Sequence, residues 1–113
     1  MAPAPAQFDF SDYMPSEVLL GQPYSAEADI YGFGILLSEI DTQQTPYGKL
    51  RETISRETLA SQVDLGLRPS MNKECPEVVQ ALAAKCTHKD PSKRPTAQEV
   101  LVLLQFYCIN EII

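Results

Sequence analysis

Three short stretches of this chain combine residue types at spacings that could do chemistry. Tyr31–Gly34 has the sequence Y-G-F-G and contains the G-x-G of a glycine-rich loop, which could cradle a phosphate through its backbone amides. His88–Asp90 has the sequence H-K-D, a triplet whose carboxylate could take up a proton. Lys93 and Arg94 are adjacent cations, but two are too few to form an anion site. What each stretch can do depends on the element that positions it.

The cysteines give no further site. Cys75, Cys86 and Cys108 are an odd number, and they lie at neither a C-x-x-C nor a metal-ligand spacing. We therefore expect reduced thiols, as in a cytosolic or nuclear protein. No base lies near Cys108 in the sequence, so a nucleophilic role for it has little support. No metal site is predicted.

Length and charge narrow the classes of partner. The chain has 113 residues, which predicts a single domain, and a formal net charge of −6. Nucleic acids and anionic membranes require a cationic footprint, so neither is an expected partner. No run reaches the roughly 18 consecutive apolar residues of a membrane helix. The N-terminal residues lack the basic and apolar regions of a signal peptide.

Helix signals recur along the chain. Ser25 is a suitable N-cap for a helix that runs to about Ile40. Residues 53–64 predict a second, more polar helix, and Pro76 is suited to the first position of a third. The dipeptide Asp-Pro at 90–91 ends that third helix.

The last helix has the clearest start. Thr96 and Glu99 form a T-x-x-E capping box ahead of an apolar run, and the sequence FYCINEII continues the helix. No segment predicts a convincing strand. The expected fold class is therefore all-α.

The helix over residues 26–40 is apolar on almost every side, yet it contains a carboxylate. At 100° per residue, Asp29, Phe33, Leu36 and Ile40 fall on nearly one line. One explanation for Asp29 is its place in the first turn, where a carboxylate favours the helix dipole by about 0.3–1 kcal/mol. The two internal glycines each cost roughly 1 kcal/mol relative to alanine. They suggest a central helix that other backbone approaches closely on all sides.

Four stretches in order resemble the second half of a protein kinase catalytic domain, most closely the tyrosine-kinase-like serine/threonine group. They are YMPSEVL, PYSAEADIYGFGILLSEI, LRP and CPEVVQALAAKCTHKDPSKRPTAQEVLVLL, between roughly Tyr13 and Leu104. The resemblance implies a helical C-lobe fragment of the kinase fold that lacks the N-terminal β lobe. Residues 1–12 would be a flexible lead, and residues 13–105 would be a partial C-lobe, from the end of the activation segment through the last helix. Residues 106–113 would be a C-terminal helical extension.

The resemblance also implies roles for three residues. Asp29 matches the aspartate that accepts hydrogen bonds from backbone amides of the catalytic loop. Glu17 matches the glutamate that closes the activation segment, and Arg94 matches the arginine that pairs with it. The alternative is that Glu17 and Arg94 are two solvated surface charges, which would contribute about 0–1 kcal/mol even if paired.

The parts of a kinase that do the chemistry are absent from this sequence. It contains no G-x-G-x-x-G and no V-A-I-K strand. The G-x-G of Tyr31–Gly34 lies inside the predicted core helix. The H-K-D triplet lacks an asparagine five residues on, where Pro95 stands, and it follows the central helix instead of preceding it. The D-F-S at Asp9–Ser11 imitates D-F-G, but it lies too close to Glu17 for an activation segment to fold between them. We therefore assign no catalytic, cofactor-binding or metal-binding residue to this chain.

Two functions remain open. The first is a partial protein kinase domain, whose family transfers phosphate from ATP to protein serine or threonine with magnesium, and which alone is inactive. The second is a stand-alone, pseudokinase-like interaction module. A helical adaptor without enzymatic ancestry fits the periodicity but not the D-I-Y-G-F-G and R-P-T runs. The expected partner is the missing kinase half or another protein, bound through an exposed apolar face, and self-association is an alternative.

Overall fold

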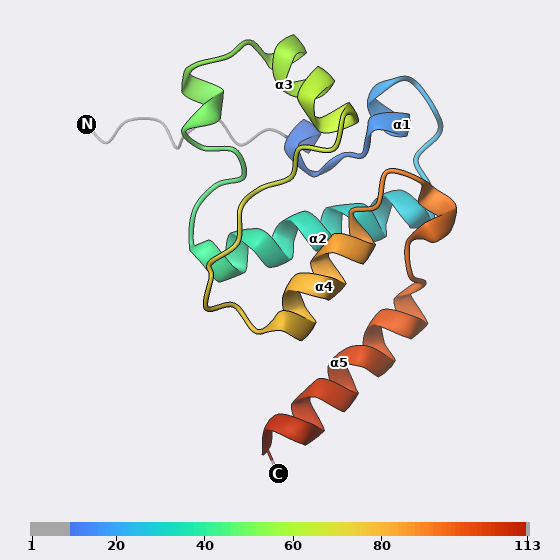
Figure 1. The fold of residues 1–113 in the computed structure, drawn as a ribbon. Coiled ribbons are helices and arrows are strands. Elements are labelled where there is room, and N and C mark those ends of the chain that lie inside the picture. Colours follow the sequence, from blue (N-terminus) through green and yellow to red (C-terminus); the bar gives the residue numbers. More distant parts are fainter. Residues whose placement is uncertain (1–9, 113) are drawn as a thin grey trace, which may run out of the picture.

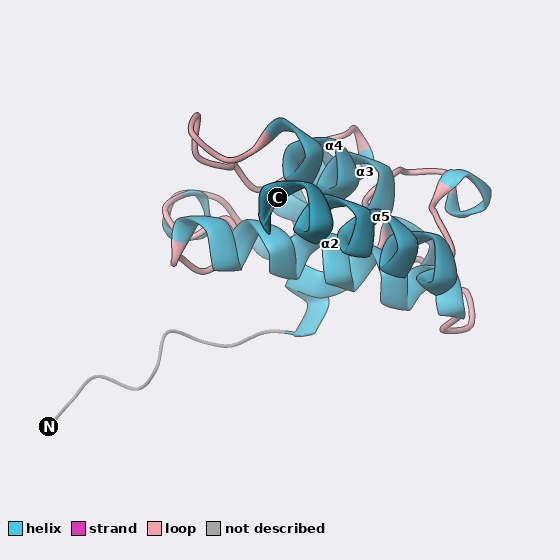
Figure 2. Ribbon diagram, turned by 90° about the horizontal axis from the view of Figure 1, so that it is seen from below, coloured by secondary structure: helices cyan, strands magenta, loops and turns pink. Residues whose placement is uncertain are grey.

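The computed structural model of the chain describes residues 10–112. Helices connected by loops make up this part of the chain, and it contains no strand (Figures 1 and 2). The all-α expectation is therefore confirmed. The elements are three 3-10 helices, η1 (Phe10–Tyr13), η2 (Leu50–Glu52) and η3 (Pro91–Lys93), and five α-helices, α1 (Ser16–Leu19), α2 (Ala26–Thr42), α3 (Arg56–Asp64), α4 (Glu77–Cys86) and α5 (Ala97–Ile112).

The longest helix, α2, crosses the middle of the molecule, with α4 packed along it (Figure 1). Helices α1 and α3 lie on one side of α2, and α5 lies on the other side. The predicted cap of α2 is confirmed, because the Ser25 hydroxyl accepts a hydrogen bond from the Ala28 amide at 3.2 Å. The helix ends at Thr42, and the C-cap residue Gln43 has a left-handed φ of 58°.

The two glycines of α2 mark the points of closest approach to other segments. A Cβ atom on Gly34 would lie 2.6 Å from the Thr87 side chain and 2.8 Å from Cβ of Cys86, at the end of α4. A Cβ atom on Gly32 would lie 3.2 Å from the carbonyl oxygen of Tyr13. The prediction that these glycines admit close approach is therefore confirmed.

Two helices begin later in the sequence than predicted. Helix α3 begins at Arg56 instead of residue 53, because the Ser55 hydroxyl accepts from the Thr58 amide at 3.1 Å and caps the helix there. Pro76 is not the first helical residue. Its ψ of 138° is extended, so it is the N-cap and α4 begins at Glu77.

The capping box of α5 is confirmed in both directions. The Thr96 amide donates to the Glu99 carboxylate at 3.1 Å, and the Glu99 amide donates to the Thr96 hydroxyl at 3.1 Å. The predicted continuation of this helix is also confirmed, since α5 runs to Ile112.

Two apolar clusters hold these elements together. One joins α2, α4 and α5, and its members are Leu82, Cys86 and Val100 with Ile30, Phe33, Leu37 and Leu104. The other lies around α3, and its members are Tyr47, Leu59 and Val63 with Leu50, Ile54 and Leu67. The first cluster thus packs α2 against α4 and α5, and the second packs α3 against the segment that follows α2.

The predicted lead at residues 1–12 lies partly within the described residues. Residues 1–9 lie outside the described residues, but residues 10–12 belong to η1. Asp12 is 6% exposed, and its carboxylate lies 3.0 Å from the Arg51 guanidinium. The ion pair ties this end of the lead to η2, a contact that no local signal in the sequence announces.

Candidate functional site

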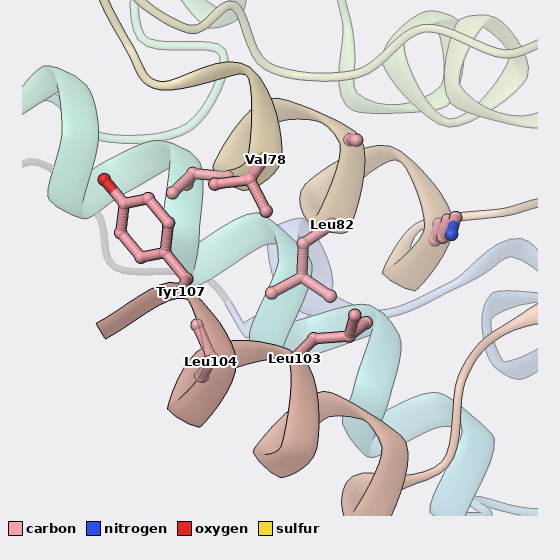
Figure 3. Close-up of a pocket in the computed structure, with 8 residues that line it drawn as sticks. Val78, Leu82, Leu103, Leu104 and Tyr107 are labelled. Atoms are coloured by element: carbon pink, nitrogen blue, oxygen red, sulfur yellow. The ribbon is translucent and has the colours of Figure 1, made fainter. Parts of the chain in front are cut away.

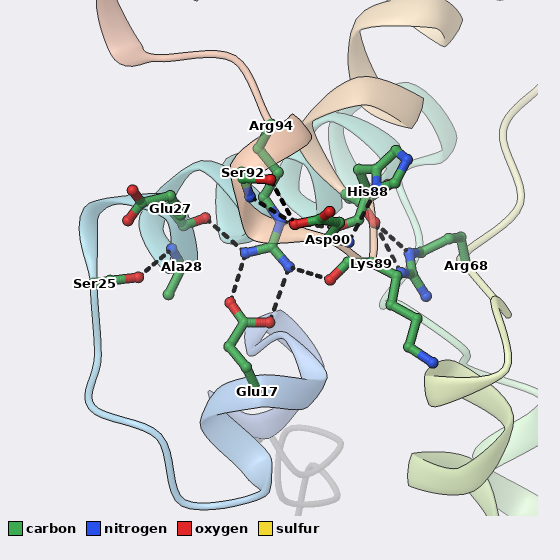
Figure 4. Close-up of polar contacts among 11 residues, drawn as sticks. Glu17, Ser25, Glu27, Ala28, Arg68, His88, Lys89, Asp90, Ser92 and Arg94 are labelled. Atoms are coloured by element: carbon green, nitrogen blue, oxygen red, sulfur yellow. Dashed lines mark hydrogen bonds and ion pairs between the residues drawn. The ribbon is translucent and has the colours of Figure 1, made fainter.

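The polar centre of the fold is an ion pair between Glu17 of α1 and Arg94, the residue after η3 (Figure 4). Nη1 of Arg94 donates to one carboxylate oxygen of Glu17 at 2.7 Å, and Nη2 donates to the other at 3.0 Å. The Arg94 side chain is 1% exposed and that of Glu17 is 20% exposed. The pair is therefore a buried, bidentate contact instead of two solvated charges.

Arg94 also binds three backbone carbonyls. Nε donates to the carbonyl of His88 at 2.7 Å, Nη1 to that of Glu27 at 3.1 Å, and Nη2 to that of Lys89 at 3.4 Å. One guanidinium thus joins α1, the first turn of α2 and the loop that follows α4. Because all these acceptors surround a buried cation, removing the arginine would leave several polar groups without a partner.

The charge of Glu17 is stabilised in this setting. Burial would raise the pKa of its carboxyl. The hydrogen bond from Arg94, a backbone hydrogen bond and the guanidinium charge together outweigh that effect, so the pKa lies below its ordinary value. Near neutral pH, the Glu17 carboxyl is therefore ionised in its pair with Arg94.

Arg68 is a second arginine that binds several backbone carbonyls, and it is half-buried. It donates to the carbonyl of Thr87 from Nε at 2.9 Å and from Nη2 at 2.8 Å, and to the carbonyls of Val63 and Leu67 from Nη1 at 2.9 and 2.7 Å. The only local signal for it was its place in the L-R-P run. Arg68 ties the end of α3 to the end of α4.

Tyr31 of α2 lies between the two arginines. The guanidinium carbons of Arg68 and Arg94 are each 5.1 Å from the centre of its ring, and the residue is 1% exposed. Stacking of a guanidinium on an aromatic face contributes about 0.5–2 kcal/mol, depending on burial. The central helix is thereby connected to both arginine networks.

The H-K-D triplet has a structural role here. The backbone amide of Asp90 donates to Nδ1 of His88 at 2.9 Å. The carboxylate of Asp90 accepts from the amide and the hydroxyl of Ser92, at 3.0 and 2.8 Å, and caps η3. These hydrogen bonds from Ser92 lower the pKa of the Asp90 carboxyl. The triplet thus lies between the end of α4 and the start of η3.

Asp29 lies about half a turn around α2 from Tyr31, the residue that stacks on the two arginines. Its side chain is exposed, and so are Leu36 and Ile40, at 42% and 58%. The opposite side of the helix, with Tyr31 and Ile35, is fully buried. The expectation that α2 is surrounded on all sides is therefore wrong within the described residues. We call Asp29, Leu36 and Ile40 the outer stripe of α2.

We compared the sequence of the chain with models of known protein families. The model of a family described as protein tyrosine and serine/threonine kinase matches residues 7–104, most of the chain. The chain belongs to the protein kinase family. The matched range contains the Glu17–Arg94 pair, Arg68 and the outer stripe of α2, so all the features described above lie in the kinase-like part.

Individual kinases match over much the same range. Mitogen-activated protein kinase kinase kinase 7 of Homo sapiens is 33% identical over 92 residues, which are 81% of this chain and 15% of that protein. The protein of the same name from Bos taurus is 33% identical, over 81% of this chain and 16% of its own length. A probable serine/threonine-protein kinase of Dictyostelium discoideum is 36% identical, over 81% of this chain and 10% of its own length. The chain thus spans only a small part of these kinases.

The G-x-G of this kinase-like segment does not form a phosphate-binding loop. The G-x-G at Gly32–Gly34 lies inside α2, and Gly34 faces α4 with no room for a Cβ atom, so its amides cannot cradle a phosphate. Among the described residues, no group of three or more His, Cys, Asp or Glu could hold a metal ion. None of the helices in residues 10–112 is long and apolar enough to span a membrane.

Proposed function

We propose that this chain is the structural part of the C-terminal lobe of a serine/threonine protein kinase domain. In the complete domain, the family's activity is transfer of phosphate from ATP to protein hydroxyls. In this part, the Glu17–Arg94 pair tethers α1 to the start of α2, and the rest of the domain packs against α2. The chain alone is inactive, because it contains none of the phosphate-binding or metal-binding motifs.

The observation that carries this proposal is the outer stripe of α2. The helix is the centre of the fold, yet Leu36 and Ile40 on this side are 42% and 58% exposed. Asp29 adds an exposed carboxylate to the same side. A partner that fits has apolar side chains for the two aliphatic residues and N–H donors for the carboxylate. By the resemblance, a catalytic loop of the same kinase domain supplies such donors.

A complementation experiment tests the stripe. The 113-residue chain is co-expressed with a tagged kinase segment that runs from the glycine-rich loop through D-F-G of the human relative. We expect the two to co-purify, and the double variant Leu36→Glu, Ile40→Glu to lose co-purification. Leu65→Glu is the matched control, because Leu65 is 80% exposed and lies after α3, away from the stripe. Equal loss with both variants, or co-purification insensitive to either, would contradict the proposal.

The predicted inactivity is tested separately. We expect no phosphate transfer from radiolabelled ATP to casein or myelin basic protein, and no change in the melting temperature on addition of Mg-ATP. A stabilising shift of the melting temperature would reveal a nucleotide site outside the known motifs and would overturn this part of the proposal.

A stand-alone interaction module is the second candidate. The closed networks around Arg94 and Arg68 favour it, since they allow the chain to keep its fold without the other half. A single cooperative unfolding transition of the isolated chain, together with failure of the complementation, would favour this module over the kinase part.

A further inference from the structure

The two apolar clusters of the fold are separate cores. The first joins α2, α4 and α5, whereas the second is formed within residues 47–67, which contain η2 and α3. No described residue belongs to both clusters. We call residues 47–67 the α3 unit, because α3 is its longest element.

The packing of the helices follows the same division. Helix α2 packs chiefly on α4 and η1, whereas α3 packs chiefly on α1 and η2. In Figure 1, η2 and α3 lie together on one side of α2, next to η1 and α1. The helical contacts that connect the α3 unit to the central helix therefore run through η1 and α1.

The junction between the two cores is incompletely packed. A hollow of about 100 Å³ lies where η1 and α1 meet α3, with Leu19 and Leu59 in its wall. A second hollow, of about 290 Å³, lies between the end of α2 and the α3 unit, with Thr42 and Leu67 in its wall. The space between α4 and α5 around Leu82, inside the first core, is smaller, at about 70 Å³ (Figure 3). Side chains that line a hollow lack part of the dispersion contacts of a close-packed interior, which weakens the junction.

Polar side chains bridge this junction at its η1 end. The Asp12 carboxylate is 4% exposed and lies 3.0 Å from Nη1 of Arg51 in η2, whose side chain is 14% exposed. It also lies 4.0 Å from Nη1 of Arg56 in α3. The same nitrogen of Arg56 donates to the Ser11 hydroxyl at 2.8 Å. Because Asp12 is buried, loss of its cationic partner would leave an uncompensated charge.

The bridge extends from η1 to α2, and a second bridge lies at the other end of the α3 unit. The Tyr13 hydroxyl donates to the Glu39 carboxylate of α2 at 2.5 Å, so η1 is bound to the central helix. At the other end, Arg68 donates to the carbonyl of Leu67 at 2.7 Å and to that of Thr87, after α4, at 2.8 Å. The α3 unit is thus held by polar contacts at both ends.

We propose that the α3 unit opens from the rest of the fold as one cooperative segment, and that the contact of Asp12 with Arg51 holds it closed. Proteins open in such contiguous segments at free energies below that of global unfolding. The α3 unit has its own core, and a few polar contacts across a loosely packed junction attach it. A displacement of η1 from α2 would therefore release α3. The inference is independent of the proposed function, since every contact in it lies within this chain.

Native-state hydrogen exchange of the full 113-residue chain, followed by mass spectrometry, tests the proposal. We expect the amides of α3 to exchange faster than those of α2 and α4. Asp12→Asn should raise the exchange rate of the α3 amides by about tenfold or more, and that of the α2 and α4 amides by less than about twofold. Equal exchange rates in the three helices would overturn the proposal. So would an Asp12→Asn variant that raises all three alike or none.

Asp64→Asn is the matched control. Asp64 of α3 pairs with Lys89 across the same junction at 3.7 Å, but the two side chains are 42% and 61% exposed. Loss of this exposed pair should change the α3 exchange rate by less than about twofold. An effect as large as that of Asp12→Asn would overturn the role of Asp12.

Arg51→Lys is a milder second variant. It keeps a positive charge near Asp12, so the α3 exchange rate should rise by less than in Asp12→Asn. Circular dichroism shows whether each variant keeps its helices. Complete unfolding of the chain by Asp12→Asn or by Arg51→Lys would overturn the proposal, because the α3 unit and the first core would then be one cooperative unit.

Discussion

Glu17 and Arg94 are 77 residues apart in the sequence, and their side chains meet at 2.7 and 3.0 Å in a buried, bidentate ion pair. Arg94 simultaneously holds the carbonyl of Glu27 at the start of α2. The pair and this third contact therefore join α1 and the first turn of α2 to a residue in the last third of the chain. Both residues lie in the part of the chain that matches the protein kinase family model.

Removing either partner of this pair should destabilise the fold. Arg94→Ala leaves the Glu17 carboxylate and several backbone carbonyls without a donor. Loss of one partner of a buried pair costs about 3–5 kcal/mol, and we expect the lower part of that range because Glu17 is 20% exposed. Urea unfolding followed by circular dichroism measures the change. Glu27→Ala is the control, because Arg94 contacts only the backbone carbonyl of that residue.

A double-mutant cycle isolates the pair from its surroundings. Glu17→Gln and Arg94→Lys, made singly and together, should give a coupling free energy of about 1 kcal/mol or more. A coupling energy near zero would mean that the two side chains act independently, as solvated surface charges do.

The lowered pKa of Glu17 gives the stability a defined dependence on pH. Because the folded-state pKa is below the unfolded one, the unfolded state binds more protons as the pH falls. The stabilisation from this carboxylate is fully present above the ordinary glutamate pKa of about 4.3 and is lost as the pH falls through the lowered value. The difference in unfolding free energy between wild type and Glu17→Gln should therefore shrink below about pH 4. A difference that stays constant from neutral to acidic pH would contradict this account.

Gly34 is the glycine whose replacement should matter most for the packing of α2 on α4. A Cβ atom there would lie 2.6 Å from Thr87 and 2.8 Å from Cys86. The overpacking costs about 1–3 kcal/mol, against a gain of about 1 kcal/mol from the helix propensity of alanine. We expect Gly34→Ala to lower the melting temperature and Gly34→Val to lower it further. Gly32→Ala is the comparison, because its closest contact is a carbonyl oxygen at 3.2 Å. A larger loss at Gly32 than at Gly34 would contradict the packing described here.

The three cysteines should react at very different rates. Cys108 is exposed, whereas Cys75 and Cys86 are buried. Burial raises the pKa of the Cys86 thiol to about 11 and also raises that of Cys75. Titration with Ellman's reagent should label one thiol rapidly in the folded chain and three in denaturant. Cys108→Ser should abolish the rapid phase, and rapid labelling of a second thiol in the native protein would contradict the observed burial.

The helix starts at Ser25 and Thr96 could be predicted from the sequence because each depends on contacts within one helical turn. The Ser25 cap, and the reciprocal bonds between Thr96 and Glu99, need no distant partner. The two glycines of α2 likewise predicted close approach, because glycine inside a helix carries a cost that packing must offset. The sequence could not say which segment approaches at each glycine.

The sequence by itself determined the helical fold, the principal caps and, through its motifs, the kinase resemblance that paired Glu17 with Arg94. Only the tertiary structure decided what lies inside and outside. Periodicity placed Asp29, Phe33, Leu36 and Ile40 on one line of α2. Phe33 packs against the cluster with α4 and α5, whereas the other three are exposed. The physical reason is that burial depends on which distant elements cover a helix face. A local pattern shows which residues share a helix face, but segments many residues away decide whether that face is buried. Arg68 is another example, because its four hydrogen bonds connect the ends of two helices that are distant in the sequence.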